Sequence, residues 1–395
     1  MSLIEPRYRT LYIGLFGNFV VYGIGMTIIG ATLPKILADF SWSYTGAGAV
    51  LAAGSLGYFI STYLSGMLLQ RLGPRVVAAG GLVVQALSLA VFALVPSIVV
   101  NFIIYFIMGL GQGGTEVTIN YAVVRMERKG ESHLMSIIHA AFSVGAVIGP
   151  LVIGLIIRMG FSWQLLYRGL GAVTLVMAVI LAILPFGRLT LSNVETPEMR
   201  ASLARPERQP MFYLAFFLLL VYVGVELGSS NWVSEYFVTI LGSTPSVGAF
   251  MVSVFWIGLL VGRVGVPVVF RRAAHAKVLT GLALFTTLSL AGALLFHNPV
   301  VVGAGFFFTG LGCSAIYPLI MTIIGHFFDE GQNRAIGFAA AGGGVGSLVF
   351  PFIMAAVSQG FGLRTGFLLY VFMALVMSGI GFAVLVQVRK KKVAA

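Results

Sequence analysis

Apolar stretches of about 20 residues recur along the whole chain, and no other feature constrains its fold so strongly. About 20 apolar residues are what a helix needs to cross a bilayer. Charged residues are 9% of the 395-residue chain, whereas a soluble domain carries roughly 25%, so the bilayer must be the solvent for most of the protein. The runs predict twelve membrane-spanning helices, at 11–33, 46–69, 76–95, 98–124, 135–159, 164–186, 211–240, 246–268, 275–296, 299–326, 335–358 and 364–388.

The net charge of +12 is unevenly distributed between the two sides of this predicted membrane protein. With twelve helices both termini lie on one side, and that side carries all the lysines and arginines except Lys35, Arg158, Arg168 and Arg364. Cytoplasmic loops are the ones enriched in Lys and Arg. We therefore expect both termini to be cytoplasmic and the chain to lie in an inner or plasma membrane. The basic excess sets the orientation and does not indicate nucleic-acid binding.

Two similar halves are joined by one polar segment. YFIMGLG at 105–111 corresponds to FFFTGLG at 306–312, and VGAVIGP at 144–150 corresponds to VGSLVFP at 345–351, both at an offset of 201. The expected architecture is all-α, with pseudo-symmetric six-helix bundles at 1–186 and 211–395 and a cytoplasmic linker at 187–210. Internal repeats of this kind are typical of secondary transporters, whose substrate site lies at the repeat interface near the bilayer midplane.

The loop after the second predicted helix carries a family-like motif. Its key residues are Gly66, Gln70, Arg71, Gly73 and Arg75, and the second half keeps a remnant that ends in Gly262 and Arg263. With six plus six helices, this pattern resembles the major facilitator superfamily and its G-x-x-x-D-R-x-G-R signature, with Gln70 in place of the usual Asp. The resemblance implies alternating access and a conformational or gating role for these residues.

The segment GLGQGGTEVTIN at 109–120 contains G-x-G-x-x-G, the pattern of a dinucleotide-binding loop. Such a loop needs a strand before it and a helix after it, but this one lies inside a long apolar span. We interpret its glycines as a helix-packing seam. Gln112, Glu116 and Asn120 are four residues apart and form a polar stripe on one helix face.

Two acidic residues, Glu116 and Glu226, lie well inside predicted spans, where a charge is costly unless it is paired or faces water. The repeat mirrors neither: Glu116 corresponds to Tyr317, and Glu226 corresponds to Met26. This asymmetry favours a role in binding a ligand or a proton. The structural alternative is burial of each acid beside a partner such as an arginine.

Around these acids the chain resembles a narrower group. Glu116-x-x-x-Asn120 is similar to the helix-4 motif of the fucose–galactose–hexose symporters, and 137–150, with His139, resembles their helix 5. The run from Tyr222 through Glu226 to Trp232 resembles sodium-dependent glucose transporters. The resemblance implies proton coupling and sugar binding at Glu116, with His139 as a relay candidate. The symporters' helix-1 Asp is Gly30 here, so Glu226 is a candidate second acid.

Other polar and aromatic residues are candidates to contact a substrate. They are Asn18, Tyr22, Gln112, Asn120, Tyr222, Asn231, Trp232, Trp256 and Tyr317. Gly145, Gly149 and Pro150 resemble a helix-5 motif of superfamily exporters and are conformational candidates.

No enzyme motif is present in the sequence, so we expect ion-driven or downhill transport without an organic cofactor or a metal. The predicted function is uptake of a sugar-like solute coupled to protons, or else to sodium, by a monomer. The open alternatives are an exporter of amphipathic or cationic compounds and a transport-inactive receptor or scramblase.

Overall fold

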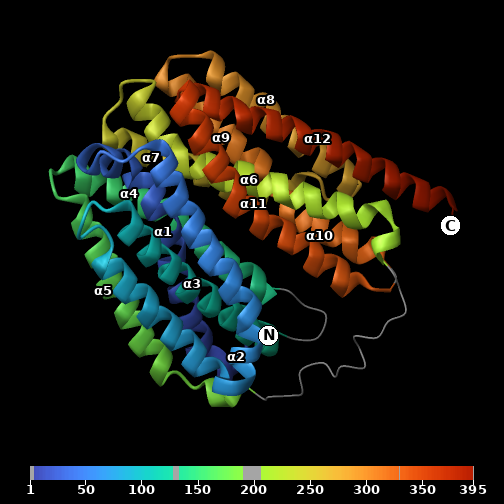
Figure 1. Cartoon of the computed structure of the whole chain (residues 1–395). Helices are drawn as coiled ribbons and strands as arrows, with labels where there is room; N and C mark the ends of the chain where they lie inside the picture. The colour runs from blue at the N-terminus through green and yellow to red at the C-terminus, as the bar shows by residue number, and fades with distance from the viewer. Residues whose placement is uncertain (1–3, 128–132, 190–205, 329, 395) are drawn as a thin grey trace. The chain divides into compact units, whose positions relative to one another are not determined.

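The computed structural model describes residues 4–127, 133–189, 206–328 and 330–394, and within these ranges all regular structure is helical (Figure 1). The chain divides into two compact units, Met1–Ser192 and Asn193–Ala395. The first contains α1 (Arg9–Phe40), α2 (Tyr44–Val91), α3 (Ile98–Met126), α4 (His133–Arg158) and α5 (Trp163–Ile183). The second contains α6 (Pro210–Thr239), α7 (Pro245–Val269), α8 (His275–Leu295), α9 (Pro299–Cys313), α10 (Ile316–Phe327), α11 (Gln332–Phe361) and α12 (Leu363–Ala394). Most of the expected linker, 190–205, lies outside the described residues.

Within the described residues, eleven helical stretches are long and apolar enough to cross a membrane. The longest, α2, has 48 residues, and a straight helix of that length would measure about 72 Å against a hydrocarbon core of about 30 Å. Its backbone leaves the helical region at Gly73, with φ 76° and ψ 160°. Gly57 and Gly81, on either side of this kink, both contact residues 106–115 of α3. The chain therefore turns back at Gly73, between the two helices expected at 46–69 and 76–95.

The observed helix boundaries differ from the expected ones at two prolines. The helix expected at 11–33 continues to Phe40 with Pro34 inside it, because membrane helices tolerate an internal proline when neighbouring groups satisfy the freed backbone. The helix expected at 299–326 is instead broken at Ser314–Ala315 into α9 and α10. Pro318 explains this break, since its ring lacks an N–H and clashes with the carbonyl group four residues earlier, that of Ser314.

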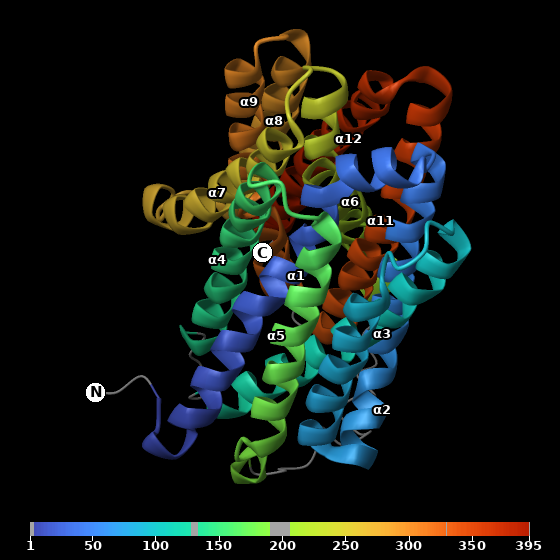
Figure 2. The same ribbon diagram turned by 90° about the vertical axis from the view of Figure 1, so that its left-hand side faces the viewer.

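Glycines set the closest helix contacts, and the two units repeat them. A β-carbon at Gly109 would overlap the carbonyl oxygen of Gly54 in α2, and one at Gly145 would overlap that of Val20 in α1. At an offset of 200 to 201, Gly310 meets Phe255 and Gly346 meets Leu220 in the same way. Figure 2 shows α1 and α4 running side by side along this contact. Gly109–Gly114 thus lies inside α3, as the packing interpretation requires.

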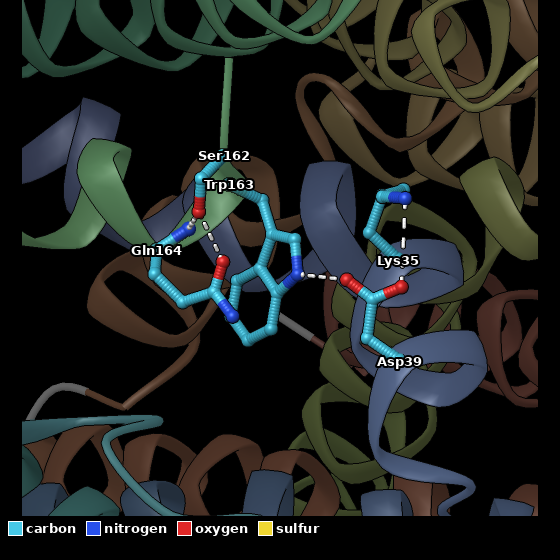
Figure 3. Close-up of polar contacts among 5 residues, drawn as sticks. All are labelled: Lys35, Asp39, Ser162, Trp163 and Gln164. Atoms are coloured by element: carbon cyan, nitrogen blue, oxygen red, sulfur yellow. Dashed lines mark hydrogen bonds and ion pairs between the residues drawn. The ribbon is translucent and has the colours of Figure 1, made fainter. Parts of the chain in front are cut away.

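A polar contact joins the C-terminal end of α1 to the start of α5 (Figure 3). The indole Nε1 of the buried Trp163 donates to Oδ2 of Asp39 at 2.7 Å, and Lys35 Nζ lies 3.5 Å from Oδ1. Ser162 caps α5 by accepting a hydrogen bond from the backbone N–H of Gln164 at 3.2 Å. The indole N–H is therefore bound to a charged acceptor.

We expect Trp163→Phe to lower the free energy of unfolding by about 2 kcal/mol, because a hydrogen bond to a charged group stabilises more than a neutral one. Trp42→Phe is the matched control, since the Nε1 of Trp42 donates to the neutral carbonyl of Pro96 at the same 2.7 Å. It should cost about half as much. Thermal unfolding in detergent measures both, and equal losses would contradict the charge-assisted interpretation.

Candidate functional site

The carboxyl group of Glu116 in α3 is the centre of a polar cluster in the first unit. The phenols of Tyr22 in α1 and Tyr58 in α2 donate to its Oε2 at 2.7 and 2.9 Å. Asn120, one turn further along α3, is within hydrogen-bonding reach of the same carboxyl group. Three helices thus converge on one acidic side chain, and Glu116 itself is half-buried.

A glycine contact brings two of these helices, α2 and α3, close together at the cluster. A β-carbon at Gly113 would lie 2.6 Å from the carbonyl oxygen of Tyr58, so the backbones of α2 and α3 touch one turn before Glu116. A larger residue at Gly113 would push Tyr58 away from the carboxyl group.

Sequence analysis missed Tyr58. At the offset of 201 that relates the halves, Tyr58 corresponds to Leu259. It therefore breaks the repeat, as Glu116 does, and the same criterion applied to tyrosines would have found it.

The other candidates of the first unit lie around this cluster in different ways. Gln112 is buried, and Asn120 keeps its Oδ1 without a hydrogen-bond partner among the described residues. Asn18 is 1% exposed, and both polar atoms of its amide lack partners within the same ranges. It shares a face of α1 with Gly14, which meets Leu184 just after α5, and with Gly25, which meets Gln85 of α2 and Leu170 of α5. The structure thus brings Tyr22 to the carboxyl group and encloses Asn18.

His139 is exposed on α4, and its ring lies edge-on to Phe19, with centroids 5.7 Å apart. Gly145 and Gly149 pack against the backbone of α1, and Pro150 is buried in α4. The exporter-like motif therefore has a packing function in this structure.

In the second unit, Glu226 of α6 is 7% exposed. The phenol of Tyr222, one turn earlier, is hydrogen-bonded to its carboxyl group, and Arg263 of α7 is close enough to attract it electrostatically. Tyr317 faces Tyr222, with ring centroids 6.5 Å apart. The two acids therefore differ in their surroundings: phenols and an amide bind the Glu116 carboxyl, whereas Tyr222 binds the Glu226 carboxyl and Arg263 attracts it electrostatically.

The two tryptophan candidates are enclosed within the second unit. Trp232 is fully buried, and the Nε1 of Trp256 donates to Ser230 at 2.8 Å. Asn231, between Ser230 and Trp232, is half-buried. Both indoles are buried in this structure.

Another buried acid, Glu235, lies near the C-terminal end of α6, which ends at Thr239. It is 5% exposed, and the hydroxyl of Thr239 donates to it. The side chain of Glu235 is therefore enclosed within the second unit.

The motif expected after the second helix lies around the kink of α2. Gly66, Gln70 and Arg71 are exposed there. Arg75 is exposed as well, and its Nη2 donates to the carbonyl of Leu184 at 3.2 Å. Arg75 thus binds the end of α5.

Comparison with known proteins decides the family. Residues 15–306 and 272–395 match the sequence profile described as Major Facilitator Superfamily. The chain belongs to this superfamily. It is a helical, multi-pass facilitator, and several of its relatives are named as transporters.

Individual relatives of this facilitator resemble it over most of their length. The glucose/mannose transporter GlcP of Bacillus subtilis is 23% identical over 84% of this chain and 85% of its own. A bacterial homologue of the human lysosomal transporter Spinster has a TM-score of 0.80, with 14% identity over 96% and 97% of the two chains. The Escherichia coli fucose:proton symporter FucP has a TM-score of 0.64, with 20% identity over 95% and 99%. At these identities the two structures show a shared fold.

We expect Tyr58→Phe to reduce the transport kcat/KM of this facilitator about tenfold, the effect of losing one hydrogen bond to a carboxyl group. Tyr63→Phe is the matched control, because Tyr63 lies on the same helix and is 81% exposed. Initial uptake rates in proteoliposomes measure both variants. Equal uptake rates for the Tyr58→Phe and Tyr63→Phe variants would show that the Tyr58 hydroxyl does not contribute to transport.

Proposed function

We propose that this facilitator is a secondary active symporter that uses protons to take up a neutral sugar or a similar polyhydroxylated solute. The observation that carries the proposal is the set of neutral partners around Glu116: two phenols and one amide. A carboxyl group enclosed by neutral donors can gain or lose a proton without leaving a cation unpaired beside it. Glu116 is therefore the proposed proton-carrying group.

Glu226 takes a different role in this proposal. Arg263 of α7 attracts the Glu226 carboxylate electrostatically, and a nearby opposite charge favours a charged carboxyl group over a neutral one. We therefore assign Glu226 a role in acting on the substrate or on the conformational equilibrium.

Amides supply the proposed contacts to substrate hydroxyls. Gln112 and Asn120 are one turn on either side of Glu116 on the same face of α3, and the Oδ1 of Asn120 can accept a hydrogen bond. An amide both donates and accepts, which suits a hydroxyl group. A substrate bound there would contact the protonated group directly, and this contact would couple its binding to protonation.

The relatives agree with the proposed substrate class. GlcP is named as a glucose/mannose transporter and FucP as a fucose:proton symporter. The proposal also includes twelve spans arranged as six plus six, cytoplasmic termini, an inner-membrane location and a monomeric state. The uneven distribution of Lys and Arg supports the orientation.

The test is uptake of radiolabelled sugars into proteoliposomes that contain the purified full-length chain. An inward proton gradient should drive accumulation of at least one neutral sugar, and a protonophore should abolish it. If a sodium gradient alone drove accumulation, the coupling ion would be sodium and not the proton. Efflux of lipophilic cations without uptake of any sugar would overturn the proposal in favour of an exporter.

A further inference from the structure

An apolar groove runs along the outer surface of the first unit, between the second half of α2 and α5. Its volume is about 340 Å³. It is lined by Arg75, Val76, Ala79, Gly80, Val83, Ala178, Val179 and Ala182. Seven of these side chains are apolar and small or medium-sized, and Arg75 is the single charged one. The groove is thus amphipathic along its length, with a cationic end.

The two walls of the groove are antiparallel helices. Arg75 bonds the carbonyl of Leu184 just after α5, and Gly171, near the other end of α5, contacts Ala86. The wall from Arg75 to Val83 measures about 12 Å along the helix, at about 1.5 Å per residue. The charged end lies at a membrane surface, because the chain turns at Gly73 and α5 ends at Ile183. The apolar part therefore extends from that surface towards the middle of the bilayer.

A small residue creates the space in this groove. A β-carbon at Gly80 would meet no atom within 4 Å, while Val83 and Val179 stand out on either side with 38% and 59% of their surface exposed. The opening lies on the surface of a membrane-spanning unit, and lipid tails are the apolar groups that the bilayer supplies there. An extended hydrocarbon chain is the partner that such a groove can accommodate.

Arg75, at the cationic end of the groove, favours an anionic lipid head group. An arginine has five N–H donors and binds phosphate in a forked geometry. The bond to Leu184 uses Nη2 of Arg75, so the guanidinium keeps donors for a second acceptor. Basic residues at a membrane surface attract anionic lipids by about 1 kcal/mol each.

We propose that this groove is a binding site for an anionic phospholipid, with one acyl chain between α2 and α5 and the phosphate on Arg75. The lipid would bridge the turn of α2 and the end of α5, which Arg75 already joins. This inference is independent of the proposed function.

The test is native mass spectrometry of the delipidated full-length chain, titrated with palmitoyl-oleoyl phosphatidylglycerol or phosphatidylcholine. The wild type should bind the anionic lipid more tightly. Arg75→Gln should weaken phosphatidylglycerol binding about tenfold, the effect of losing a charge-assisted hydrogen bond, and Arg75→Lys should recover much of it. Gly80→Leu should weaken binding of both lipids, because its side chain fills the groove while Arg75 remains.

Two variants serve as matched controls. Arg272→Gln removes an exposed charge from the second unit, and Gly281→Leu adds the same bulk where a β-carbon also meets no atom; both should bind like the wild type. The proposal is overturned if Gly80→Leu and Arg75→Gln retain wild-type affinity, or if the two lipids bind equally. Competition by the soluble glycerophosphoglycerol head group alone would also overturn it, as an anion site without a lipid. Should Arg75→Gln fail to fold, Gly80→Leu decides the outcome, because leucine is favourable in a helix.

Discussion

Glu116→Gln is expected to abolish proton-driven accumulation of substrate and to leave substrate exchange intact. Glutamine keeps the size and hydrogen-bonding capacity of the side chain but cannot exchange a proton, so Tyr22 and Tyr58 retain an acceptor. One proton crossing about 100 mV supplies about 2.3 kcal/mol, enough for roughly 40-fold accumulation. The wild type should approach this ratio, and the variant should equilibrate substrate without concentrating it.

The measurements are uptake into proteoliposomes with an imposed proton gradient and counterflow without one. Glu235→Gln is the matched control, because it also removes a buried carboxylate from a helix, one that Thr239 binds. It should retain both activities. If Glu116→Gln accumulated substrate like the wild type, the proton would have to bind elsewhere. Loss of counterflow as well would place Glu116 in substrate binding rather than in coupling alone.

Gly145→Ala is expected to destabilise the folded protein by about 3 kcal/mol, the upper part of the usual range for overpacking. A β-carbon there would overlap the carbonyl oxygen of Val20, a backbone atom that cannot move unless α1 and α4 separate. Gly346→Ala should have the same effect in the second unit, because its β-carbon would overlap the carbonyl oxygen of Leu220. Thermal unfolding in detergent and the yield of folded protein are the measurements.

Gly17→Ala is a control for which we expect no loss of stability, or a gain. It lies in α1, where a β-carbon meets no atom within 4 Å, and alanine is favoured over glycine in a helix by up to about 1 kcal/mol. This variant should be as stable as the wild type or more stable. A Gly145→Ala protein that unfolded at the same temperature as Gly17→Ala would show that α1 and α4 can separate at little cost.

The helical, membrane-spanning character of the chain followed from local sequence patterns. Long apolar runs and few charges identify membrane helices because each helix satisfies its own backbone hydrogen bonds within a single segment. Even the fingerprint-like glycines of 109–114 could be placed in a helix by their context. Boundaries at proline were less predictable: Pro34 stays within α1, whereas Pro318 separates α9 from α10. The effect of a proline depends on whether neighbouring groups satisfy the freed carbonyl, and those neighbours are distant in sequence.

The sequence by itself determined that this protein is a membrane-embedded bundle with an internal repeat, and that Glu116 and Glu226 are its exceptional acids. Only the tertiary structure decided what surrounds each acid: Tyr22 and Tyr58 at Glu116, but Arg263 near Glu226. It also enclosed Asn18 and Trp256, which the sequence had offered as substrate contacts. The physical reason is that hydropathy and spacing are properties of one helix, whereas a partner belongs to another. Which side chains meet depends on how closely the glycine contacts let the helices approach, and on how each helix is rotated there.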